Sequence, residues 1–171
     1  MHTRITSVSR GRVIENPASG ERIVVRQTGA ETGGELLAFD LFLAPGGRVP
    51  SSHVHPEQEE TFTVLEGRMR FRIGLRSRLV GPGETVRVPP GAVHAFANVG
   101  REPAHLLVEA RPALNTEEML GMAAGLDRPW RRPLQLAVFL EEFVREVRVP
   151  FVPAPLVRAV TLPLAWLAAR R

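Results

Sequence analysis

The sequence contains no cysteine, no lysine and no tyrosine. Without cysteine, the chain can form no disulfide and has no thiolate to bind a metal or act as a nucleophile. Without lysine, Schiff-base chemistry is excluded. The lack of both lysine and tyrosine also removes two common acid–base groups, so proton transfer would fall to water or a carboxylate.

All 22 basic residues are therefore arginine, and against 18 acidic residues they give a net charge of +4. The arginines are spread along the chain, without the basic and aromatic runs that nucleic-acid binding requires, so no nucleic-acid partner is expected. The first ten residues, MHTRITSVSR, lack the apolar core of a signal peptide, and we expect a cytoplasmic protein.

Short strand-like segments dominate residues 11–110. Most of them end in Gly or Pro, and they recur every 8 to 12 residues or so, which is typical of a β-sandwich or barrel. Residues 12–28 have the form of a hairpin with a loop at NPASG. In RMRFRIG, residues 68–74, apolar and arginine residues alternate, which predicts one buried and one wet face.

The pattern changes to a helical one after Ala110. Asn115 and Glu118 have the spacing of a capping box at the start of a helix. Residues 134–147 repeat apolar side chains at helical spacing after Pro133, which predicts an amphipathic helix through Val147. We therefore divide the chain into a β domain, residues 1–111, and a helical extension, residues 112–171, which packs on the barrel or on a partner subunit.

The last 23 residues, 149–171, are apolar but contain four prolines and Arg158. Proline interrupts a helix and arginine is costly inside a membrane, so a membrane span is not expected. We expect this tail to pack on protein.

Histidine and carboxylate residues are concentrated in HVHPEQEE, residues 53–60. His53 and His55 are two residues apart, so both point to one face of an extended segment. Glu60 shares a face with Phe62, whereas Glu59, which is equally ionisable, lies on the other face; alternation favours Glu60. Two imidazoles and a carboxylate suit one divalent ion, with Fe or Mn favoured and Ni, Cu or Zn also compatible. His94, after a Pro-Pro-Gly turn, could supply a fourth ligand.

These residues also carry a family resemblance. Residues 47–67 match the first cupin motif, Gly, five residues, His-x-His, three or four residues, Glu, six residues, Gly. Residues 83–98 match the second, Gly, five residues, Pro-x-Gly, two residues, His, three residues, Asn. The chain thus resembles the cupin superfamily. The resemblance implies a mainly β, double-stranded β-helix (jelly-roll) barrel, here with an α-helical extension, and a metal held by His53, His55, Glu60 and His94.

Alternation along the strands also predicts the substrate pocket. Its expected lining is apolar and consists of Phe62, Val64, Met69, Phe71 and Phe96. Such a pocket favours an apolar or aromatic ligand that chelates the metal through oxygen, and a dioxygenase-type oxidoreductase in which Glu60 is the catalytic carboxylate. The alternative is a non-catalytic cupin that binds or senses a small molecule. We expect a homodimer, and we assign no site to His2, His105 or Asn98.

Overall fold

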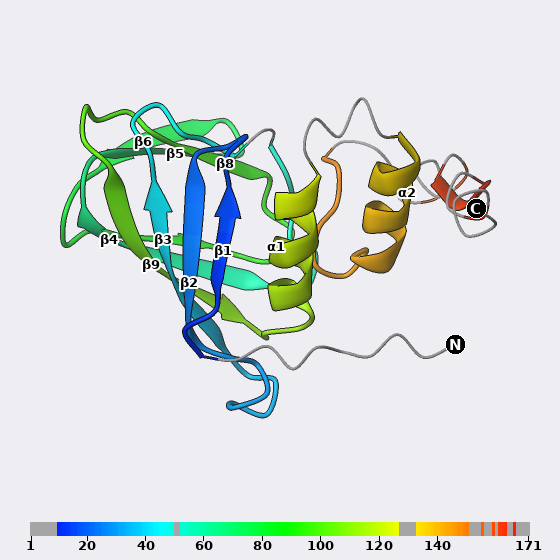
Figure 1. The fold of residues 1–171 in the computed structure, drawn as a ribbon. Coiled ribbons are helices and arrows are strands. Elements are labelled where there is room, and N and C mark those ends of the chain that lie inside the picture. Colours follow the sequence, from blue (N-terminus) through cyan, green and yellow to red (C-terminus); the bar gives the residue numbers. More distant parts are fainter. Residues whose placement is uncertain are drawn as a thin grey trace.

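The computed structural model describes residues 10–49, 52–126 and 133–150, together with residues 155, 159, 161–163 and 166. Figure 1 shows a strand-rich region that is followed along the chain by helices α1 and α2. The elements are β1 (Val13–Asn16), β2 (Glu21–Gln27), β3 (Leu37–Leu43), β4 (Glu59–Glu66), β5 (Met69–Ile73), β6 (Arg76–Val80), β7 (Thr85–Val88), β8 (His94–Asn98), β9 (Ala104–Arg111), α1 (Thr116–Gly125) and α2 (Pro133–Glu142).

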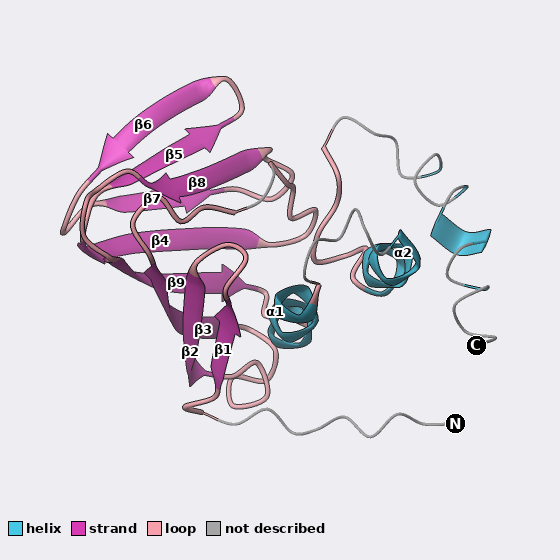
Figure 2. Ribbon diagram, turned by 45° about the horizontal axis from the view of Figure 1, so that its top comes forward, coloured by secondary structure: helices cyan, strands magenta, loops and turns pink. Residues whose placement is uncertain are grey.

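The strands form two antiparallel sheets. The larger has the order β1-β2-β3-β9-β4-β7 and the smaller the order β6-β5-β8, and Figures 1 and 2 show the smaller sheet lying over the larger one. Strand β9 lies between β3 and β4, which come far earlier in the chain. The mainly β jelly-roll fold with a helical extension, as predicted, is the fold observed.

The strand pattern places the core between the two sheets. In β5, Met69 and Phe71 are buried while Arg70 and Arg72 are exposed, which confirms the predicted alternation. In β4, the inward face carries Glu60, Phe62 and Val64. A carboxylate therefore occupies an inward position next to an apolar core.

Gly67 makes the turn from β4 to β5 possible. Its φ is 88°, a left-handed conformation that favours glycine. A Cβ atom at this position would also lie 2.7 Å from the Cα of Ala104, at the start of β9. Both the backbone conformation and the close approach of β9 therefore require glycine.

The helices pack on the barrel at the β1 side. Helix α1 contacts β1, and Leu120 and Ala124 of α1 pack against the barrel core. Helix α2 packs on α1 through a second apolar cluster that contains Met119, Phe139 and Phe143. The extension thus covers part of its own barrel.

Two details of the helices differ from the predictions. Asn115 makes no side-chain capping hydrogen bond. Instead its backbone N–H donates to Oε1 of Glu146, at 3.1 Å. A carboxylate from a distant part of the chain thus accepts the hydrogen bond of this N–H group at the start of α1. Helix α2 ends at Glu142 and not at Val147, because the chain turns there and Arg148 pairs with Val54 in an isolated β-bridge.

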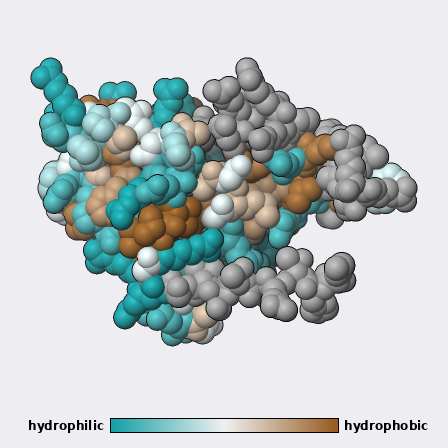
Figure 3. Space-filling model, viewed as in Figure 1, coloured by the Kyte–Doolittle hydropathy of each residue, from teal (hydrophilic) through white to brown (hydrophobic). Residues whose placement is uncertain are grey.

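Most of the apolar tail lies outside the described residues, and so do Arg158 and His2. Thr161 of the tail donates a hydrogen bond to Glu141 of α2. None of the helices in the described part of the chain has the length and apolarity needed to cross a membrane. On the face seen in Figure 3, hydrophilic side chains surround a smaller apolar area of the barrel.

Candidate metal centre

Four predicted ligand residues meet at one end of the barrel. His53 and His55 lie in the segment before β4, Glu60 is the second residue of β4, and His94 is the first residue of β8. The backbone N–H groups of His53 and His94 each donate to the other residue's carbonyl at 3.0 Å, so this two-residue ladder fixes the two histidines side by side. The barrel therefore unites side chains from both cupin motifs.

The ligand atoms of these residues all lie within 4.8 Å of one another. Nε2 of His94 is 3.1 Å and Nε2 of His55 is 3.4 Å from Oε2 of Glu60. Bonds of about 2.0–2.2 Å to a central ion place pairs of ligand atoms about 3 to 4.4 Å apart. Small side-chain adjustments would thus let all four residues bind one ion.

The backbone fixes which imidazole nitrogen faces the centre. Nδ1 of His94 lies 3.1 Å from the carbonyl oxygen of Ala92, and Nδ1 of His55 contacts the carbonyl oxygen of Glu146. A carbonyl oxygen can only accept, so each Nδ1 carries the proton and donates it. In the neutral imidazoles, both Nε2 lone pairs are therefore directed at the centre, the arrangement that metal-binding histidines require.

Glu60 is an almost fully buried carboxylate, with 7% of the residue exposed. Burial raises its pKa, but the nearby charge of His55, the hydrogen bond from His94 and the charges of His94 and His53 lower it by more, to about 2. These causes act when the imidazoles are protonated and Nε2 of His94 donates to the carboxylate. In the neutral tautomers described above that positive charge is missing, and an ionised Glu60 needs another counter-charge. A divalent cation would provide this charge while it accepts the lone pairs of two imidazole nitrogens. The donor set therefore fits one metal ion.

The neighbouring candidates point elsewhere. Glu59 lies on the outer face, where its carboxylate is 2.6 Å from Nε of Arg87. His105 lies on the outer side of the sheet with its Nε2 2.6 Å from Oδ1 of Asp40. Asn98 is buried, and its Nδ2 donates to three backbone carbonyls, those of Leu43, Ala44 and Glu102. It holds turns together, and its position agrees with our assigning it no site.

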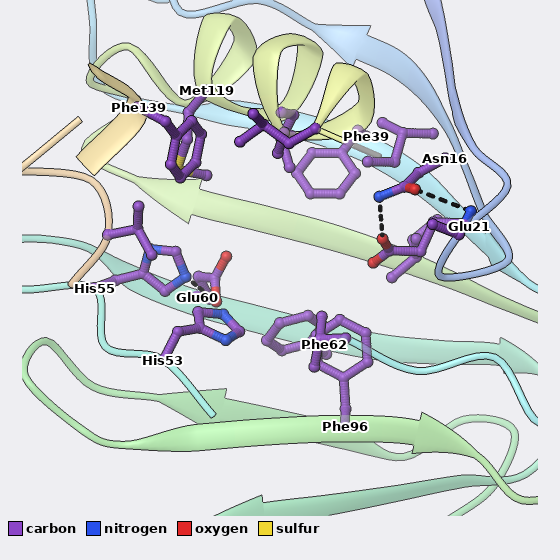
Figure 4. Close-up of a pocket in the computed structure, with 18 of the residues that line it drawn as sticks. Asn16, Glu21, Phe39, His53, His55, Glu60, Phe62, Phe96, Met119 and Phe139 are labelled. Atoms are coloured by element: carbon purple, nitrogen blue, oxygen red, sulfur yellow. Dashed lines mark hydrogen bonds and ion pairs between the residues drawn. The ribbon is translucent and has the colours of Figure 1, made fainter. Parts of the chain in front are cut away.

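A cavity of about 580 Å³ opens next to the ligand cluster (Figure 4). His53, His55 and Glu60 line it, whereas His94 is fully buried behind them. Of the predicted pocket residues, the structure places Phe62 and Phe96 in the lining.

The other three predicted pocket residues, Val64, Met69 and Phe71, are at most 1% exposed and belong to the closed core. Phe71 forms a second layer, with its ring centroid 5.1 Å from that of Phe62 and 5.6 Å from that of Phe96. Alternation identified their inward direction correctly, but an inward residue can lie deeper than the cavity. These three residues therefore lie outside the lining of this cavity.

Several lining residues were missed. Asn16 and Glu21 line the cavity from the β1–β2 hairpin. Glu21 has the same parity as Ile23 and Val25, so alternation in ERIVVRQ could have revealed it. The extension contributes a roof of apolar side chains, which are Met119, Leu120, Ala123 and Leu126 near α1 and Leu136, Phe139 and Val147 near α2. Nothing in the local sequence indicates that these side chains cover the cluster of His53, His55, Glu60 and His94, which we call the metal-type cluster below.

The fold and the site together define a class of protein. It is a jelly-roll barrel with a candidate metal centre of three histidines and one glutamate beside an apolar cavity. Residues 40–108 match the family model described as Cupin domain. This part of the chain, which contains all four residues of the cluster, is a cupin domain.

The chain is 31% identical to germin-like protein subfamily T member 3 of Arabidopsis thaliana, over 48% of this chain and 38% of that protein. It is 37% identical to oxalate oxidase 1 of Hordeum vulgare, over 38% of this chain and 36% of that protein. These matches span well under half the length of either relative. The "predicted oxalate decarboxylase" of Thermotoga maritima is similar in structure, with a TM-score of 0.54, 16% identity, and coverage of 63% of this chain and 99% of that one. This last likeness concerns the fold alone.

Proposed function

We propose that this protein is a metal-dependent oxidoreductase of the dioxygenase type, which acts on an apolar or aromatic molecule that chelates the metal through oxygen. His53, His55, Glu60 and His94 hold one divalent ion, with iron or manganese favoured because imidazole and carboxylate ligands suit both. The observation that carries the proposal is the placement of both histidine Nε2 lone pairs and an ionised carboxylate beside an apolar cavity. When bound, such an ion supplies Lewis acidity and redox chemistry with dioxygen.

The residues of the chain would then bind and enclose the substrate. Phe62 and Phe96 pack 5.2 Å apart, centroid to centroid, and present apolar surface next to the ligand cluster. The helices cover the cavity from the other side and exclude water, which strengthens electrostatic interactions inside. Glu60 is the catalytic carboxylate of the proposal, because it is the lining carboxylate next to the histidines.

Oxalate, the substrate in the names of the barley relatives, fits this cavity poorly. The volume of about 580 Å³ is far larger than a two-carbon diacid fills. Among the residues that the structure describes, the lining includes no arginine that could neutralise a dianion. A larger ligand with mostly apolar surface matches the cavity better.

A non-catalytic sensing role is the second candidate. It is favoured by the direct contact between the cluster and the helical extension, through His55 and Glu146 and through the bridge of Val54 with Arg148. Changes at the centre could reach the helices by this route. A homodimer stays a prediction under both functions.

The deciding experiment has two steps. Protein purified without an affinity tag or added metal is first analysed for Fe, Mn, Ni, Cu and Zn. The iron- and manganese-loaded forms are then incubated aerobically with catechols, flavonols, diketones and oxalate, while oxygen uptake is followed. Metal-dependent oxygen uptake with an aromatic or diketone substrate, which is lost in Glu60→Ala and retained in Glu59→Ala, is the expected result. Tight ligand binding without turnover would favour the sensing role.

A further inference from the structure

The cavity has a second polar end, formed by Asn16 and Glu21. These residues are paired at the end of the β1–β2 hairpin, and both line the same cavity as the metal-type cluster. Figure 4 shows them across the phenylalanine side chains from His53 and His55. One cavity thus connects two separate polar sites.

The strand register separates the two ends widely. Glu21 pairs with Leu43, which pairs with Ala104 at the start of β9. Glu60 pairs with Ala110, six positions further along β9 (110 minus 104). At about 3.3 Å per residue, the backbone positions of Glu21 and Glu60 are roughly 20 Å apart along the strand direction.

The space between the two ends is apolar. Among the described residues of the lining, five are polar: Asn16 and Glu21 at one end, and His53, His55 and Glu60 at the other. The remaining lining is aliphatic or aromatic, and Figure 4 shows Phe39, Phe62 and Phe96 between the ends. A ligand that fills the cavity must therefore have an apolar middle.

Glu21 can accept a hydrogen bond from a ligand. Its Oε2 accepts from the hydroxyl of Ser19 and lies 3.5 Å from Nδ2 of Asn16, so both contacts engage one oxygen and leave Oε1 for a ligand. Burial raises the pKa of Glu21, and the Ser19 hydrogen bond offsets only part of this effect. A partly buried carboxylate with few donors gains free energy when a ligand supplies another one.

We propose that the cavity binds an elongated molecule with an oxygen chelator at the metal end, an apolar middle, and an amino or hydroxyl group at the other end that donates a hydrogen bond to Glu21. The chelating half of this inference rests on the proposed function. The donor half rests on Glu21 alone.

The test uses alkylhydroxamic acids, which chelate metals through two oxygens, with octyl, decyl and dodecyl chains. At each length the chain ends in a methyl, a hydroxyl, an amino or a carboxylate group. Their binding to zinc-loaded protein is measured by calorimetry at mildly alkaline pH, so that no turnover is needed. At the length that reaches Glu21, the amino and hydroxyl compounds should bind about tenfold or more tightly than the methyl compound, and the carboxylate compound should bind most weakly.

Glu21→Gln should abolish the preference for the amino group, because the amide carries no charge, and it should leave the affinity for the methyl compound unchanged. Glu15→Gln is the matched control, since Glu15 lies one position before Asn16 with its carboxylate on the surface, 3.7 Å from Arg22. Equal affinities for all four end groups at every length, or an unchanged preference in Glu21→Gln, would overturn the role of Glu21 and leave the proposed metal function standing. Affinities that do not depend on zinc would instead overturn the proposed function.

Discussion

The imidazole of His55 donates a hydrogen bond from Nδ1 to the backbone carbonyl of Glu146, a residue 91 positions further along the chain. This contact ties the metal-type cluster to the segment after α2. The side chain of Glu146 is buried and accepts from the backbone N–H of Asn115, at the start of α1. Glu146 therefore fixes the orientation of His55 with its main chain while its side chain anchors the same turn to α1.

Replacing Glu146 by alanine should weaken metal binding without removing a ligand. The turn loses its anchor, so the carbonyl that orients His55 becomes less well placed, and losses of such outer contacts cost about 10- to 100-fold in metal affinity. Glu146→Gln should retain most of the affinity, because its amide oxygen can still accept from Asn115. Titration of the metal-free variants with Mn²⁺, with the exposed Glu142→Ala as control, measures the effect. Equal affinities in all three variants would show that the anchor has no influence on the centre.

Substitution of two adjacent glutamates, Glu59 and Glu60, tests the metal centre itself. Glu60 points into the cluster, whereas Glu59 is held by Arg87 on the outer face. Glu60→Ala and His55→Ala should each reduce the metal content of the purified protein at least about tenfold, because each removes a ligand. Glu59→Ala should leave it unchanged. A site emptied by Glu59→Ala but filled in Glu60→Ala would reverse the assignment.

Strand alternation allowed most of the barrel to be predicted, since the burial of Met69 and Phe71 and the exposure of Arg70 depend only on local sequence. The insertion of β9 between β3 and β4 could not be predicted in this way, because it joins segments far apart in the chain. That topology was expected only from the cupin motifs. The end of α2 at Glu142 was missed because a tertiary pairing, Val54 with Arg148, overrides the helical pattern.

Strand alternation also allowed part of the candidate site to be predicted. Glu60 was preferred to Glu59 because alternation specifies a face. Alternation does not specify depth, so Val64 and Met69 were expected in the pocket although they lie in the closed core. The contact of His55 with Glu146 has no sequence signal at all, since only the folded chain brings these residues together.

The outer face of the larger sheet contains an ion-pair network that should appear in acid unfolding. Burial raises the pKa of Asp40, but Arg26 and His105 lower it by more through hydrogen bonds and charge, so the net pKa lies below its usual value. A lowered folded-state pKa means that the stabilisation is fully present above the unfolded carboxyl pKa of about 3.9 and is lost as the pH falls through the folded value.

Asp40→Asn should therefore destabilise the protein by about 1 to 2 kcal/mol at neutral pH, and the difference from the parent should shrink below about pH 4. Urea unfolding at a series of pH values measures this. Glu102→Gln, at an exposed position, should follow the parent curve. A constant difference between Asp40→Asn and the parent across the acid range would mean that the ionisation of Asp40 does not contribute.

Deletion of the apolar tail would test whether the tail covers apolar surface of the helical extension. Helix α1 already packs on Phe139 of α2 and on Phe143, which follows that helix, while Leu136 and Leu140 are only partly buried. Thr161 of the tail bonds to Glu141 on the same helix. Deleting residues 150–171 should therefore leave the barrel and its metal content unchanged, because Glu146 and Arg148 remain, but it should expose apolar surface on α2.

Exposed apolar surface on a helix promotes association. The shortened protein should aggregate or change its oligomeric state, which light scattering coupled to size-exclusion chromatography would detect, and its melting temperature should fall. Metal analysis of the same sample is the internal control, since an empty site would mean that the barrel itself was disturbed. If the shortened protein keeps its oligomeric state and stability and loses only its binding to liposomes, the tail binds a membrane surface and not protein. Packing of the tail on α2 would then be wrong, because removing a packed segment must cost the free energy of the surface that it buried.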